Sequence, residues 1–178
     1  MVSRLTHESS VVIVTAIAAA SFYPYTRLVD LLDNLQSEDE GIPLVSRSFD
    51  RLGIVSAILT CFSLPAMVAV DFVIRGFFTS FIAVEFAWLG AVLWGFWIAT
   101  TVLTVNAAHT LSPVCGLISD IPDIAQTCPK IHLAEALSII MCIIVPLYPI
   151  GIILLSFTMR SKMSLSSMWF SSVREIDN

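Results

Sequence analysis

The chain has 178 residues, of which 57 % are hydrophobic and only 13 % are charged. A soluble domain carries about 25 % charged residues, so this composition excludes an ordinary soluble protein and indicates a membrane protein. The formal net charge of −5 argues against a nucleic-acid partner, because nucleic-acid-binding proteins present a basic face. We expect a single membrane domain over residues 1–178, since little of the chain is left for a soluble domain.

Four segments are apolar and long enough to cross a bilayer. The clearest are the charge-free runs Phe86–Ala108 and Ala136–Met159, of 23 and 24 residues, because about 20 helical residues cross a hydrocarbon core of roughly 30 Å. Leu52–Val70 and Ser9–Thr26 are shorter uncharged runs. With their flanks, the predicted spans are 9–32, 52–74, 78–106 and 134–159, with outer loops at 33–51 and 107–133 and a cytoplasmic tail at 160–178.

The first apolar segment has a second interpretation. Arg4, a short apolar stretch and the alanines at 18–20 resemble a cleavable signal peptide. Against this, Glu8 lies beside the apolar stretch, and a helical pattern continues beyond it as far as Leu35. The pattern favours a retained first helix, and both interpretations leave the other three spans with the same orientation.

The orientation is predicted from the lysines and arginines that flank the spans, which are enriched on the cytoplasmic side. With four spans the two sides hold nearly equal numbers of these residues, so their placement decides. Arg160 and Lys162 follow the last span directly, and Arg75 lies in the tight turn between the second and third spans. We therefore expect both termini in the cytoplasm.

The four cysteines divide into two pairs. Cys61 and Cys142 lie inside predicted spans, where a reduced thiol behaves as a small apolar residue. Cys115 and Cys128 lie 13 positions apart in the second outer loop, on the side that would be oxidising. A disulfide across such a loop stabilises a fold by about 3 kcal/mol in the chain-entropy model. We predict this disulfide, the alternative being two unpaired loop cysteines.

Three ionisable residues lie near the turn between the second and third spans. Asp71 and Arg75 are four positions apart and share a helix face, and Glu85 follows across the turn. Ionisable groups in a membrane are functional candidates by default, so one interpretation is a proton or cation site. The other is an ion-pair cluster that sets the register of the hairpin. The second is favoured, because no further charged residue continues a path deeper into a span.

The third span carries a row of small residues, each four positions from the next. Small residues at this spacing let helix backbones approach closely in lipid, so we expect a helix-packing row, the alternative being that alanine is simply common in membrane spans. Its partner is either the second span, which has a comparable row from Ala57 to Ala69, or another protomer. The row consists of Ala83, Ala87, Ala91, Gly95 and Ala99.

Signatures of catalysis and of metal binding are absent from the sequence. The three histidines (His7, His109 and His132) are widely separated, and there is no HxxxH pair, P-loop or GxSxG motif. We therefore expect no enzymatic activity, no metal site and no cofactor.

Part of the chain resembles a known family. The sequence Leu-Pro-Ala-Met-Val at 64–68, followed by Asp-Phe-Val-Ile-Arg-Gly-Phe-Phe-Thr-Ser at 71–80, is similar to the hairpin between the second and third spans of fungal MARVEL-like membrane proteins, of the basidiomycete type. Val-Glu-Phe-Ala-Trp-Leu-Gly at 84–90 and Leu-Trp-Gly-Phe-Trp-Ile-Ala-Thr at 93–100 continue the resemblance. It implies an M-shaped four-helix bundle with cytoplasmic termini and a role in membrane apposition, lipid microdomains or vesicle trafficking. The resemblance implies no catalytic residues.

We thus expect an all-α, integral membrane four-helix bundle that organises membrane microdomains or takes part in vesicle trafficking, in the plasma membrane or in vesicles of the secretory pathway. Its expected partners are membrane lipids and, through the third span, a second copy or another membrane protein. Two alternatives stay open. One is a small transporter or channel subunit that uses Asp71 and Glu85, and the other is an accessory subunit of a larger membrane complex.

Overall fold

The computed structural model describes residues 2–38, 48–73, 84, 87–117 and 122–159. These residues form the helices α1 (Val2–Glu38), α2 (Ser48–Val73), α4 (Trp94–Leu117) and α5 (Pro122–Met159), and the π-helix η2 (Trp88–Leu93), which runs directly into α4. No strand occurs in these ranges. The all-α prediction is therefore confirmed for the described part of the chain.

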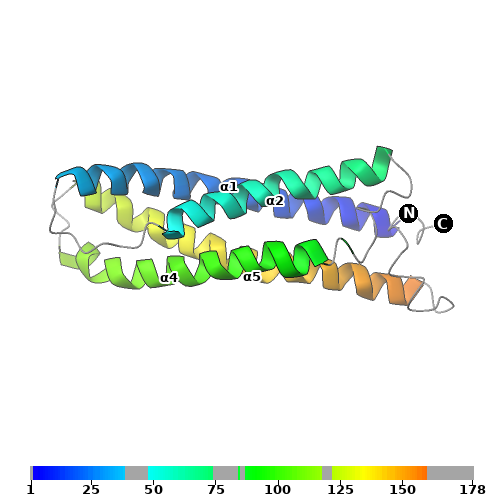
Figure 1. Cartoon of the computed structure of the whole chain (residues 1–178). Coiled ribbons are helices and arrows are strands. Elements are labelled where there is room, and N and C mark those ends of the chain that lie inside the picture. The colour runs from blue at the N-terminus through cyan, green and yellow to red at the C-terminus, as the bar shows by residue number, and fades with distance from the viewer. Residues whose placement is uncertain (1, 39–47, 74–83, 85–86, 118–121, 160–178) are drawn as a thin grey trace.

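The helices form an antiparallel bundle. α1 packs against α2 and α5, and α4 packs against the same two helices, so that α1 lies diagonally opposite α4. Figure 1 shows that successive helices run in opposite directions, and that α1 begins and α5 ends at the same end of the bundle. An M-shaped path through a membrane requires this arrangement. The side of the membrane on which the two termini lie stays a prediction.

Four helical segments are long and apolar enough to cross a membrane: Ser9–Asp30, Asp50–Met67, Trp88–Ser112 and Cys128–Gly151. The predicted number of spans is confirmed on length and composition. All four differ from the predicted spans at one or both ends, and the predicted start of the third, at residue 78, lies outside the described residues. The segment expected as an outer loop at 107–133 is helical over 107–117 and 122–133. Helices extend beyond the apolar segments because, once a helix is formed, each further residue adds a hydrogen bond. Pro122 is the first residue of α5, where the backbone N–H has no helical acceptor, so the missing N–H of proline removes no hydrogen bond.

The third span begins with a wider helical turn. In η2 the backbone N–H of Trp94 donates to the carbonyl oxygen of Leu89, five residues earlier. Such π-turns are rare and interrupt the regular register of a helix. The hydrophobic pattern alone did not predict this turn, because Leu89 and Leu93 are buried at a spacing that an ordinary α-helix also allows.

Each helix buries one face, on which buried positions recur every three or four residues. This spacing is that of helices packed as in coiled coils. Examples of the repeat are Val11, Val14, Ala18, Ser21, Tyr25 and Leu28 on α1, Trp97, Thr100, Thr104 and Ala107 on α4, and Ile131, Ala134, Ser138, Met141 and Val145 on α5.

The outer surface of the bundle is apolar. Large hydrophobic side chains are exposed on all four helices, including Val12 at 67 %, Phe62 at 73 %, Val102 at 53 % and Leu147 at 56 %. A soluble protein rarely leaves such side chains in contiguous patches. In a lipid bilayer they contact the acyl chains, so the surface supports the membrane placement independently of the span lengths.

Candidate functional site: the polar interior and the lipid-facing surface

The interior of the bundle holds hydroxyl side chains, in contrast to its apolar surface. Polar groups away from water need protein partners, because lipid offers no hydrogen bonds. The fully buried hydroxyl residues at 0 % exposure are Ser21, Tyr25, Ser56, Thr60, Thr100, Thr104 and Ser138.

Hydroxyls join α2 to α4. The Ser56 and Thr100 hydroxyls share a hydrogen bond of 2.9 Å, and the indole N–H of Trp97 donates to Thr60 Oγ1 at 3.0 Å. Ser56 and Thr60 also donate to the carbonyl oxygens four residues earlier on their own helix. Donors and acceptors are thus matched along this seam, which removes the cost of burying them.

Tyr25 connects α1 to the other three helices. Its hydroxyl lies 3.1 Å from Thr104 Oγ1 on α4 and donates to the carbonyl oxygen of Ala134 on α5 at 3.5 Å. Its ring lies against Gly53 of α2, where a Cβ atom would come within 2.6 Å of the Tyr25 Cζ atom. Only glycine therefore leaves room for the ring at position 53.

A tryptophan compensates for a proline in α5. Pro146 has no N–H, so the carbonyl oxygen of Cys142, four residues earlier, has no helical donor. The indole N–H of Trp94 on α4 donates to this oxygen at 3.1 Å. In a membrane such carbonyls are commonly satisfied by neighbouring helices, and this bond also fixes α4 against α5.

A second set of bonds lies further along the same pair of helices. Thr101 Oγ1 donates to the carbonyl oxygen of Ser138 at 3.0 Å, and Ser138 Oγ donates to the carbonyl oxygen of Glu135 at 2.8 Å. His132 Nδ1 lies 3.2 Å from Glu135 Oε2, with side-chain exposures of 55 % and 25 %. Residues 136–159 of α5, which follow this pair, carry no charged side chain.

The small-residue row of the third span faces away from the bundle. Ala87, Ala91, Gly95 and Ala99 are all exposed, and no atom lies within 4 Å of a Cβ built on Gly95. The row therefore does not pack against α2. On α2, Cys61 Sγ donates to the carbonyl oxygen of Thr15 in α1 at 3.7 Å. Contact of the row with another protein stays a prediction, and Ala83 lies outside the described residues.

The predicted ion-pair cluster lies mostly outside the described residues. Arg75 and Glu85 are not among them, and Asp71 is described only as a backbone position near the end of α2. Both the ion-pair interpretation and the cation-site interpretation stay predictions.

No disulfide has both its sulfur atoms in the part of the chain that the structure describes. Cys61 and Cys142 are free, Cys128 is disulfide-bonded, and the side chain of Cys115 lies outside the described residues. The pairing of Cys115 with Cys128 therefore stays a prediction. Among the residues described, no three His, Cys, Asp or Glu side chains lie close enough to hold a metal ion.

The polar interior and the buried Asp50 were not predicted. Asp50 is 3 % exposed in the first turn of α2, and one of its carboxylate oxygens accepts the backbone N–H of Arg51 at 2.6 Å. The sequence does carry a signal for the hydroxyls, because Ser56 and Thr60, and likewise Thr100 and Thr104, are spaced four residues apart within apolar spans.

No model of a known family, no curated protein and no solved structure matches the chain. Composition and geometry together establish an all-α integral membrane protein with four candidate spans.

Proposed function

We propose that this protein organises the membrane around it without catalysing a reaction, as the MARVEL-like proteins that its second and third spans resemble do. Its contacts are with lipids and with copies of itself, in the plasma membrane or in vesicles of the secretory pathway. We therefore expect the protein to be enriched in a lateral microdomain of the membrane or in one class of vesicle.

The observation that carries this proposal is the difference between the hydrogen-bonded polar interior of the bundle and its apolar outer surface. The hydroxyls of Tyr25, Ser56, Thr60 and Thr100 have partners within the bundle, so they hold the helices together and need no substrate. The small residues of the third span are instead exposed on the apolar outer surface. Contacts that change the surrounding membrane are made on that surface.

Self-association through the third span follows from the physics of helix packing in lipid. Apolar side chains gain nothing by leaving lipid for another apolar surface, so association depends on close backbone approach. Ala87, Ala91 in η2, and Gly95 and Ala99 in α4 are all exposed, and these small residues permit that approach along the third span.

The test compares two double variants in vesicles at a fixed ratio of protein to lipid. Ala91→Leu with Gly95→Leu places bulk in the row, whereas Ala19→Leu with Ala136→Leu adds similar bulk at exposed positions of α1 and α5. Single-molecule photobleaching is expected to show oligomers for the unaltered protein and for the second variant. The first variant is expected to lose at least tenfold in association constant, about 1.4 kcal/mol.

Equal association of both variants would contradict the role of the third span in self-association. The transporter alternative is tested in the same vesicles by measuring proton and cation flux with Glu85→Gln. Flux that disappears with this substitution, while partitioning between ordered and disordered lipid phases is unchanged, would contradict the organising function itself.

A further inference from the structure

Charged and imidazole side chains from all four helices lie at one level along the bundle. The contacts of Tyr25 with Gly53, Thr104 and Ala134 provide a common reference level. A helix rises about 1.5 Å per residue, so the basic residues lie roughly 3–8 Å from this reference level along their helices. They lie on the side towards the end of the bundle that is away from the chain termini. We call this set the interfacial layer: Arg27, Arg51, His109, Lys130 and His132.

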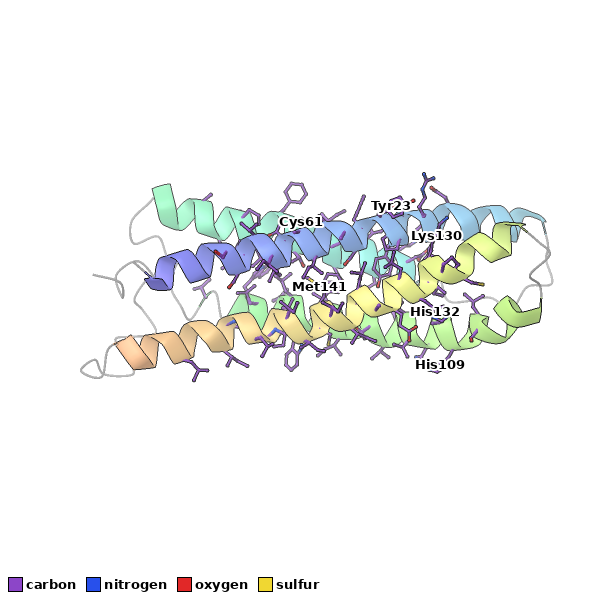
Figure 2. All side chains as sticks on the ribbon, turned by 180° about the vertical axis from the view of Figure 1, so that it is seen from behind. Tyr23, Cys61, His109, Lys130, His132 and Met141 are labelled. Carbon is purple, nitrogen blue, oxygen red and sulfur yellow. The ribbon has the colours of Figure 1, made fainter. Side chains whose placement is uncertain are left out.

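The interfacial layer surrounds the bundle. Arg27, Arg51, His109 and His132 are exposed, and Lys130 is partly so. Figure 2 shows Tyr23, His109, Lys130 and His132 towards the same end of the molecule. A protein partner would contact one side of the bundle, whereas the planar surface of a membrane meets all four helices at one level.

The side chains in this layer have the chemistry of a headgroup boundary. The Arg27 guanidinium lies 5.9 Å from the centroid of the Tyr23 ring, and Tyr23 is 56 % exposed. Tyrosine and arginine are enriched where hydrocarbon gives way to phosphate and water. Asp30 is also exposed at this level, and Glu135 pairs with His132.

The opposite boundary lies one hydrocarbon thickness away on two helices. Arg27 and Glu8 are 19 residues apart on α1, and Arg51 and Asp71 are 20 residues apart on α2, with no charged residue between either pair. These separations correspond to about 29 and 30 Å, which matches a hydrocarbon core of roughly 30 Å.

We propose that one surface of the membrane crosses the bundle at the interfacial layer, with its cations at the lipid phosphates, and that three helices continue beyond it. α1 extends eight residues past Asp30, α4 eight past His109, and α5 begins eight before Lys130, about 12 Å in each case. α2 begins only three residues before Arg51, and Figure 1 shows it starting short of the other three helices. Residues 31–38, 110–117 and 122–129 form this three-helix projection.

The inference goes beyond the proposed function, because it requires only that the chain spans a membrane. The first test measures access of a water-soluble maleimide to one introduced cysteine at a time, in lipid nanodiscs open to water on both faces. The protein carries Cys61→Ser and Cys142→Ser and keeps Cys115 and Cys128, and the labelling of this protein without an introduced cysteine is subtracted. Thr110→Cys and Ser112→Cys lie beyond the layer, and Val102→Cys and Ile139→Cys lie within the apolar surface. All four positions are exposed on the bundle.

The two outer cysteines are expected to react at least tenfold faster than the two inner ones, and all four should react equally in denaturing detergent. Protection of Ser112→Cys equal to that of Val102→Cys would overturn the proposal, as would equally fast reaction of Val102→Cys. The headgroup contact is tested with a fluorophore on Arg27→Cys and, as control, on Ile98→Cys. Nitroxide on the lipid headgroup should quench the first more than mid-chain nitroxide does, and the reverse order would overturn the contact.

Discussion

The Tyr25 side chain is the residue at which the four helices meet, and Gly53 is the residue that admits it. The ring is fully buried and its hydroxyl is held by Thr104, so it has no room to retreat from an added methyl group. Gly53→Ala is therefore expected to destabilise the protein by about 1–3 kcal/mol, the usual cost of overpacking, measured by thermal unfolding in detergent. Gly95→Ala is the control, because that position is open; it should be neutral or stabilising by up to about 1 kcal/mol. Equal melting of Gly53→Ala and the unaltered protein would contradict the packing described for Tyr25.

At the scale of the element, α5 tolerates Pro146 because Trp94 supplies the missing donor to the Cys142 carbonyl oxygen. Trp94→Phe is expected to cost about 1 kcal/mol, in the range of hydrogen bonds measured between membrane helices. In a Pro146→Ala background the cost should fall, because the helix then provides its own N–H. A double-mutant cycle measured by reversible unfolding gives this coupling directly.

The control for that cycle is Trp88→Phe, the same substitution at an indole whose nitrogen is buried and has no hydrogen-bond partner. It removes no bond and should not reduce stability through lost hydrogen bonding. Coupling between Trp94 and Pro146 that is indistinguishable from zero would show that the carbonyl oxygen needs no replacement donor.

At the scale of the whole molecule, the predicted disulfide joins α4 to α5 beyond the interfacial layer. Because the remaining thiols, Cys61 and Cys142, are free, mass mapping under non-reducing conditions is expected to find Cys115 linked to Cys128. Cys115→Ser with Cys128→Ser should lower stability by about 3 kcal/mol, whereas Cys61→Ser with Cys142→Ser should not reproduce this loss. Alkylation of Cys115 in intact, non-reduced protein would contradict the pairing. Protease access to the termini on the cytoplasmic side would agree with an oxidising compartment at the opposite end.

The helical class and the number of spans could be predicted from the sequence alone, because lipid offers the backbone no hydrogen bonds. Every span must satisfy its own N–H and C=O groups, and an apolar run such as Phe86–Ala108 is therefore sufficient to predict a helix. Helix ends were predicted less well. α4 and α5 continue through much of 107–133, since a helix can extend into water beyond its apolar part.

The tertiary structure alone decided which face of each helix is inside. In water, hydrophobicity marks the buried face, but in lipid an apolar side chain is equally well accommodated on either side. Hydropathy could not place Ala91 and Gly95 on the outer surface, or Thr100 and Thr104 within the bundle. Those positions follow from close packing and matched hydrogen bonds between helices, which depend on the arrangement of all four at once.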